Sequence, residues 1–197
     1  MLCRSACATL IVLLAMTAPQ ATASALATLR FGTACAQCHE GECSGRLSFA
    51  RRPEAAYAHI RQYAGPTDDE LARQLYDALE QMKADCSYPE LPAVDLSQAV
   101  DADDLTPYLD AWSGAYFLPL STLAPGRYQL TIDFTGGGRV RLEVIDSGFD
   151  PLTDQCITVE TQPLQVEIVL TANHPHYLRL RPRGPIRVDQ ILLKPRP

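Results

Sequence analysis

The pentapeptide Cys35-Ala36-Gln37-Cys38-His39 constrains the fold of this chain more than any other feature of its sequence. Two thiols separated by two residues and followed at once by an imidazole form a C-x-x-C-H motif, which is typical of covalent attachment of a c-type haem. Chance explains it poorly, because the chain has only 7 cysteines and 4 histidines among 197 residues. The motif therefore predicts one covalently bound haem, around which a small segment can fold.

The same motif assigns roles to its side chains. Cys35 and Cys38 are each expected to form a thioether with a haem vinyl group, and His39 to be the proximal ligand of the iron. For the distal position three alternatives stay open, namely Met82, His59, or an open or water-bound site. Met82 is favoured because a thioether in an apolar helical stripe can both pack and bind iron. A structural zinc site or a thioredoxin-like pair fits less well, since a second ligand pair and a βαβ unit are missing from the pattern.

The N-terminal 23 residues are typical of a secretory signal peptide. Arg4 precedes a short apolar run over residues 8–16, and the triplet Ala21-Thr22-Ala23 provides a cleavage site after Ala23. The run is too short to cross a bilayer. We therefore expect a periplasmic or secreted protein without a transmembrane segment in its mature chain.

A change of composition near residue 90 predicts two domains. Residues 24–90 contain the haem motif and helical periodicity, residues 91–104 form an acidic, proline-containing linker, and residues 105–197 contain alternating strands. A helix is expected from Pro53 to about Tyr63, with Tyr63 on its buried side.

A second helix is expected to begin at a capping box formed by Thr67 and Glu70. Its apolar stripe consists of Leu71, Leu75, Leu79 and Met82.

The run from Cys35 to Met82 resembles a small c-type cytochrome domain, in which the haem motif precedes a loop and two helices. The resemblance implies an all-α haem domain that carries electrons to or from a redox partner protein rather than catalysing a reaction. The expected fold class is thus α + β multidomain, with an N-terminal cytochrome c-like domain followed by an antiparallel β-sandwich.

The sandwich is predicted from about seven short strands separated by turn residues. Tyr128 to Phe134 and Val140 to Val144 alternate between apolar and polar residues, and Gly136-Gly137-Gly138 between them is typical of a hairpin. The order of residues 115–120 and 123–128 resembles jelly-roll modules of the carbohydrate-binding kind. That resemblance implies a glycan partner, whereas a docking or spacer role is the alternative.

The remaining cysteines and acidic loops suggest further sites. Cys43 is expected to pair with Cys86 in an oxidising compartment, which leaves Cys156 as a buried small hydrophobe. An aspartate group, Asp146, Asp150 and Asp154, is typical either of a calcium site or of turns.

Two basic segments near the C-terminus complete the candidates. His174 and His176 could hold a metal only with a third ligand. The arginines at positions 179, 181, 183 and 187 are expected to form a solvated face.

The net charge of −6 disfavours a nucleic-acid partner, which requires a basic domain. Together these features predict an exported single-haem cytochrome that transfers electrons and uses its sandwich for docking. The alternatives are a haem peroxidase or sensor with an open distal site, and a carbohydrate-binding module that carries a redox centre.

Overall fold

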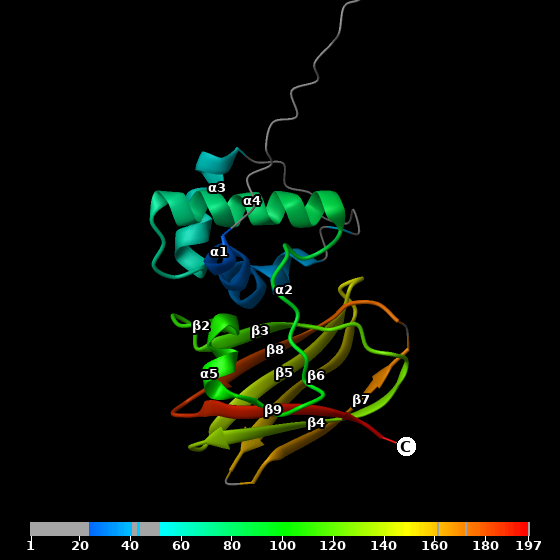
Figure 1. The fold of residues 1–197 in the computed structure, drawn as a ribbon. Coiled ribbons are helices and arrows are strands. Elements are labelled where there is room, and N and C mark those ends of the chain that lie inside the picture. Colours follow the sequence, from blue (N-terminus) through cyan, green and yellow to red (C-terminus); the bar gives the residue numbers. More distant parts are fainter. Residues whose placement is uncertain (1–23, 41–42, 44–51, 161, 172, 197) are drawn as a thin grey trace, which may run out of the picture.

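A computed structural model describes residues 24–40, 43, 52–160, 162–171 and 173–196. Two antiparallel sheets face each other, and a layer of helices lies against one of them (Figure 1). The predicted signal peptide, residues 1–23, lies outside the described residues. Within the described part of the chain, no helix is long and apolar enough to span a membrane.

The helical layer comes from the N-terminal part of the described chain. Its elements are α1 (Ala25–Arg30), the π-helical turn η1 (Phe31–Cys35), α2 (Ala36–His39), α3 (Pro53–Tyr63) and α4 (Asp69–Asp85). The predicted bounds of α3 are confirmed, with Pro53 in the first turn. The predicted capping box of Thr67 and Glu70 is wrong. The N-cap of α4 is Asp68, one residue after Thr67, and its side chain accepts a hydrogen bond from the Leu71 amide at 2.8 Å.

Among the described residues, the sandwich contains nine strands. They are β1 (Val100–Asp101), β2 (Leu109–Asp110), β3 (Ala115–Leu120), β4 (Gly126–Thr135), β5 (Gly138–Asp146), β6 (Pro151–Val159), β7 (Leu164–Leu170), β8 (His176–Arg183) and β9 (Arg187–Pro195). One sheet has the order β1-β9-β4-β7 and the other the order β2-β3-β8-β5-β6. The short helix α5 (Ala102–Leu105) and the 3-10 turn η3 (Thr106–Tyr108) precede β2. The sandwich arrangement and the seven predicted strands, which correspond to β3 to β9, are confirmed, whereas the short strands β1 and β2 were not predicted.

The predicted hairpin at Gly136-Gly137-Gly138 is wrong. Strand β4 pairs with β7 and β9, whereas β5 pairs with β6 and β8, so the glycines carry the chain from one sheet to the other. A Cβ on Gly138 would lie 2.6 Å from the Arg183 carbonyl oxygen, which explains a glycine at this crossing. Alternation marks the inward face of a strand but does not tell which sheet the strand joins.

The expected all-α cytochrome c-like domain is also wrong. The described chain is dominated by the two antiparallel sheets, and its short helices form a layer on the five-stranded sheet (Figure 1). One apolar cluster joins the buried residues of α4, including Leu75 and Met82, to Phe117 of β3 and Tyr177 of β8. The helices therefore complete their core with side chains of the sheet rather than around a porphyrin.

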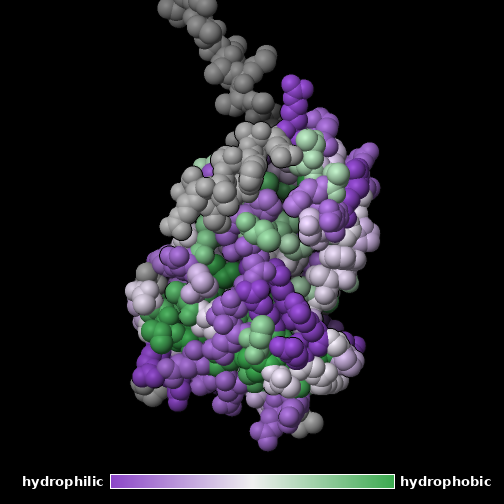
Figure 2. All heavy atoms as spheres, turned by 180° about the vertical axis from the view of Figure 1, so that it is seen from behind, coloured by the Kyte–Doolittle hydropathy of each residue, from purple (hydrophilic) through white to green (hydrophobic). Residues whose placement is uncertain are grey.

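Strand β3 shows the result of this layering. All six of its residues are buried, because its inner face packs in the sandwich core and its outer face is covered by the helices. Seen from behind, hydrophilic residues cover most of the visible surface, with hydrophobic residues in small groups between them (Figure 2).

Residues 91–104, the expected linker, run along the sandwich. Val94 and Leu96 belong to its apolar core, and Val100 pairs with Ile191 of β9. The division of the chain into two domains stays a prediction.

Candidate functional site

The C-x-x-C-H segment is a part of the helical layer that contacts the five-stranded sheet. Gln37 of α2 donates to Glu143 of β5 at 3.1 Å and accepts from Arg181 of β8 at 2.9 Å. Glu40, which follows α2, accepts from Arg179 at 2.5 Å. These contacts fix the segment on the sheet through the residues around the thiols, not through the thiols themselves.

The two thiols of the motif are in different environments. Cys35 is half-buried at the start of α2, whereas Cys38 is exposed, and both are unbonded. Desolvation raises the pKa of the Cys35 thiol to about 12, although Arg30 opposes the shift. A thiol of such high pKa is mostly protonated near neutral pH and is a poor nucleophile.

The structure does not support the predicted haem. The Met82 side chain is fully buried in the apolar cluster of the helical layer, whereas His59 is exposed and lies against Tyr63, with ring centroids 4.7 Å apart. The His39 and His59 rings are 6.2 Å apart in a T-shaped arrangement. Among the described residues, no three His, Cys, Asp or Glu side chains are grouped to hold a metal ion. The predictions of a bound haem, an iron site and electron transfer are therefore wrong. A functional role of Cys35, Cys38 and His39 stays a prediction.

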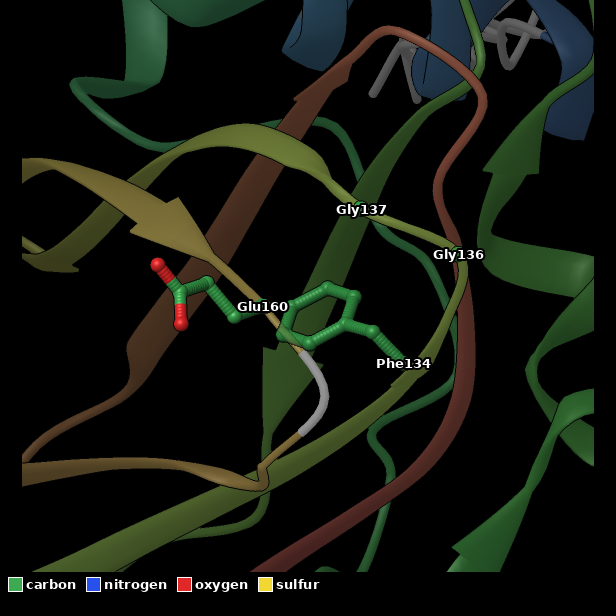
Figure 3. A pocket seen from close by; sticks show the side chains of 4 residues that line it. All are labelled: Phe134, Gly136, Gly137 and Glu160. Carbon is green, nitrogen blue, oxygen red and sulfur yellow. The ribbon is translucent and has the colours of Figure 1, made fainter.

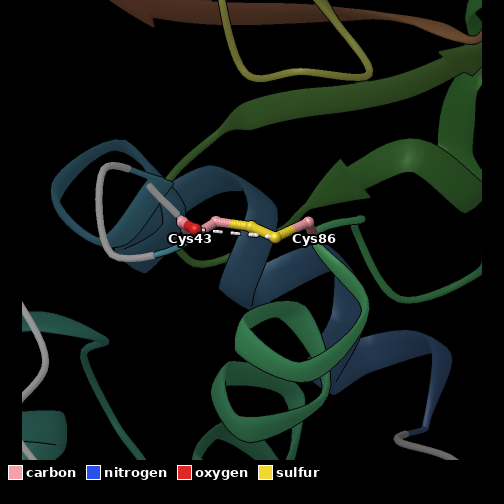
Figure 4. The surroundings of a disulfide bond; sticks show 2 residues. All are labelled: Cys43 and Cys86. Atoms are coloured by element: carbon pink, nitrogen blue, oxygen red, sulfur yellow. Dashed lines mark hydrogen bonds between the residues drawn. A yellow bond between two sulfur atoms is a disulfide. The ribbon is translucent and has the colours of Figure 1, made fainter. Parts of the chain in front are cut away.

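The disulfide prediction is confirmed, and the prediction for Cys156 is wrong. Cys43 and Cys86 are bonded, with Cα atoms 5.4 Å apart, and the bond ties the segment after α2 to the end of α4 (Figure 4). Cys156 is exposed, because it lies on the outer side of the edge strand β6.

Of the two alternatives for the aspartate group, a calcium site or turns, the structure supports a turn, together with an ion pair, and the described residues form no metal site. Asp146 accepts hydrogen bonds from the amides of Gly148 and Asp150, which shapes the turn between β5 and β6. Asp154 instead accepts two hydrogen bonds from Arg141, at 2.9 and 2.8 Å.

His176 is fully buried, and its ring lies 4.8 Å from that of His174. Both ring nitrogens of His176 lack a hydrogen-bond partner among the described residues. Desolvation, reinforced by His174, lowers the pKa of His176.

A hollow at the junction of the helices and the five-stranded sheet, which we call the junction hollow, offers a more complete binding site than the C-x-x-C-H segment. Its volume is about 310 Å³, and its wall includes two aromatic residues that are each about half exposed, Trp112 and Tyr63. Polar groups from η1, the β2–β3 turn and β8 complete its wall. The lining residues are Thr33, Ala34, Tyr63, Trp112, Ser113, Ala115, Arg181, Pro182 and Arg183.

The turn that presents Trp112 is built around Asp110. The buried Asp110 carboxylate accepts from Arg30 Nε at 2.8 Å and from Ser113 Oγ at 2.6 Å. The Gly114 amide closes the turn by donating to the Asp110 carbonyl at 2.8 Å. A buried ion pair with these additional hydrogen bonds holds the turn in one conformation.

Contacts with Arg30 and Gly65 hold the Trp112 ring in place. The Arg30 guanidinium lies 5.3 Å from the ring centroid and also donates to the Ala64 carbonyl at 2.7 Å. The next residue, Gly65, has φ +74° and lies so close to the indole that a Cβ would clash with it. Even so, 48% of Trp112 is exposed, so the fixed ring still offers surface to a ligand.

A second hollow, of about 400 Å³, lies where β4 ends and β6 ends (Figure 3). Its wall contains Phe134, Gly136, Gly137 and Glu160. The Phe134 ring extends toward the Glu160 side chain (Figure 3). This hollow combines one aromatic ring with one carboxylate and lacks the anchored, exposed tryptophan of the junction hollow.

No protein-family model and no curated protein matches the chain. Among solved structures, a ruminal GH26 endo-β-1,4-mannanase is similar, with TM-score 0.38 and 12% identity over 54% of this chain and 27% of that one. A family 35 carbohydrate-binding module from an environmental isolate has TM-score 0.33 and 18% identity over 43% of this chain and 71% of the module.

A GH115 4-O-methyl-α-glucuronidase, BtGH115A, has TM-score 0.37 and 13% identity over 73% of this chain and 25% of that one. The chain thus spans about a quarter of the length of each of the two enzymes.

Sequence reasoning missed the junction hollow. It placed Tyr63 on the buried side of α3, but 56% of this residue is exposed. Trp112 is the single tryptophan of the chain and lies in a turn, outside any periodic pattern. An isolated tryptophan between turn residues was the one available signal.

Proposed function

We propose that this protein is a carbohydrate-binding protein and that the junction hollow is its binding site. The proposal rests on one observation: a fixed, half-exposed Trp112 shares a hollow with Tyr63 and with hydroxyl and guanidinium groups. Ligand sites typically combine apolar and aromatic surface with a few polar groups that orient the ligand.

The chemistry of a sugar fits this wall. A pyranose ring has a face of C–H groups that can stack on an aromatic ring, and a rim of hydroxyls that need hydrogen-bond partners. Trp112 and Tyr63 supply apolar surface, while Ser113 and Arg181 supply donors and acceptors beside it. Because Arg30 and Gly65 already fix the indole, binding costs little additional side-chain entropy.

The proposal includes an exported location and a binding rather than a catalytic role. The predicted signal peptide over residues 1–23 and the Cys43–Cys86 disulfide both suit an oxidising compartment. The Asp110 carboxylate, which organises the turn that presents Trp112, is fully buried and accepts hydrogen bonds from Arg30 and Ser113, as expected of a structural group.

The single tryptophan provides a direct test. Titration of the mature protein with a panel of oligosaccharides should change the fluorescence of Trp112 for at least one of them. Calorimetry of the Trp112→Ala variant with that sugar should show an affinity lowered about tenfold or more, as expected for loss of about 1.4 kcal/mol or more.

The matched control is Val169→Ala, which removes an exposed apolar side chain on the four-stranded sheet. It should leave binding unchanged. Full affinity in Trp112→Ala, with an unchanged circular dichroism spectrum, would contradict the proposed site.

A further inference from the structure

Arginines face each other across strands β5 and β8, directly beside the junction hollow. In the antiparallel register, Arg139 is opposite Arg183 and Arg141 is opposite Arg181. Their side chains lie on the outer face of the five-stranded sheet, since the adjacent residues Val140 and Leu180 belong to the sandwich core. Like charges directly opposite each other destabilise a sheet.

One member of this group is neutralised within the protein. Arg141 makes a two-bond ion pair with Asp154 and lies 3.3 Å from Glu143. Arg139, Arg181 and Arg183, in contrast, form no ion pair among the described residues.

Arg181 lies among both like and opposite charges. Its Nη1 donates to Gln37 Oε1 at 2.9 Å, whereas its Nε and Nη2 atoms are buried and have no partner within the described chain. Desolvation and repulsion from Arg179 lower the pKa of Arg181, although attraction by Glu143 and Glu40 opposes the shift. The buried charge of Arg181 therefore destabilises the folded protein.

Two of these arginines border the aromatic surface of the hollow. Arg181 and Arg183 line the same hollow as Trp112 and Tyr63. A guanidinium binds a carboxylate or sulfate through two parallel hydrogen bonds, and such a ligand would relieve the repulsion between the arginine pairs. The net charge of −6 opposes general attraction of polyanions, which separates this local site from a nucleic-acid surface.

We propose that the junction hollow is selective for acidic glycans, with Arg181 and Arg183 holding a sugar carboxylate or sulfate while Trp112 stacks on the ring. This inference rests on the proposed carbohydrate binding and adds the class of sugar. The two oxyanion sources, uronic acids and sulfated sugars, share one recognition chemistry and are separated in the experiment.

The experiment compares three glycans on the mature full-length protein by calorimetry: a neutral mannan oligosaccharide, an oligogalacturonate, and a heparin-derived sulfated oligosaccharide. At low salt one of the acidic glycans should bind at least tenfold more tightly than the neutral one. Its advantage should shrink as salt is raised, because exposed charge interactions are screened.

The variant Arg181→Gln/Arg183→Gln should weaken binding of the acidic glycan about tenfold and leave any binding of the neutral glycan unchanged. Arg187→Gln, on strand β9 of the other sheet, is the matched control and should change neither. Thermal unfolding of each variant checks that the fold is retained.

The outcomes separate the two proposals. Equal affinity for neutral and acidic glycans, unaffected by the double variant, overturns the acidic selectivity but leaves carbohydrate binding in place. Unchanged binding in Trp112→Ala overturns both. A single-stranded oligonucleotide that binds as tightly as the acidic glycan, and loses affinity in the double variant, also overturns the inference, because the arginines would then recognise phosphate.

Discussion

Replacing Phe117 by Ala should destabilise the whole protein, because Phe117 joins the helical layer to the sandwich. Its side chain is fully buried and stacks on Tyr177 with ring centroids 5.5 Å apart. It also meets Tyr88 edge-on at 4.9 Å and lies below the Arg179 guanidinium at 5.6 Å. Removal of a buried phenyl ring with such neighbours costs about 3–5 kcal/mol in free energy of unfolding.

Urea denaturation, followed by far-ultraviolet circular dichroism and by Trp112 fluorescence, measures this loss. Trp112 lies at the junction, so its fluorescence reports separation of the two layers. With an m-value of about 2 kcal/mol/M, the midpoint should fall by about 2 M, and both probes should shift together. Val169→Ala, an exposed change, should stay within about 0.5 kcal/mol of the wild type.

Two results would refute this reasoning. A loss below about 1 kcal/mol would mean that Phe117 is not enclosed as described. Wild-type transitions that differ between the two probes would mean that the helices and the sandwich unfold independently, as two domains do.

Three further predictions follow from the cysteines and from His176. In the folded protein iodoacetamide should label Cys38 much faster than Cys35, because Cys38 is exposed and the Cys35 thiol has a pKa of about 12. Mass spectrometry of timed samples measures the two rates, and equal rates would contradict the prediction. Reduction of the Cys43–Cys86 bond, which closes a loop of 43 residues, should lower the free energy of unfolding by about 2–4 kcal/mol, measured by urea denaturation with and without reductant. Because folding lowers the pKa of His176, the unfolded chain binds this proton more readily, so stability should be complete above about pH 6.5 and decline as the pH falls below that value. His176→Asn should flatten that part of the pH profile, and an identical slope in the variant would exclude His176 as its source.

Local signals in the sequence predicted local structure well. Pro53 marked the start of α3, and the alternation of Tyr128 to Phe134 marked β4, because each depends on residues close together in the chain. The pairing of Cys43 with Cys86 was also predictable, since few cysteines were available.

Most features that depend on the packing of distant segments could not be predicted. The haem prediction took five consecutive residues as decisive, whereas the fate of Met82 was decided by packing with residues such as Phe117, far away in the chain. Arg179, expected on a solvated face, is fully buried because the helical layer covers it. The junction hollow likewise joins Tyr63, Trp112 and Arg181 from three separate segments, which no short pattern in the sequence connects.

The contact between Arg179 and the carbonyl of Gly32, at 2.8 Å, spans 147 residues of sequence. The helices are synthesised first, yet their apolar cluster is closed by Phe117 of β3 and Tyr177 of β8, which are synthesised later. Folding therefore cannot be completed in the order of synthesis, and contacts of such large sequence separation slow the folding of a domain. Until its last strands are made, the chain exposes the apolar faces of its helices, which are surfaces prone to aggregation.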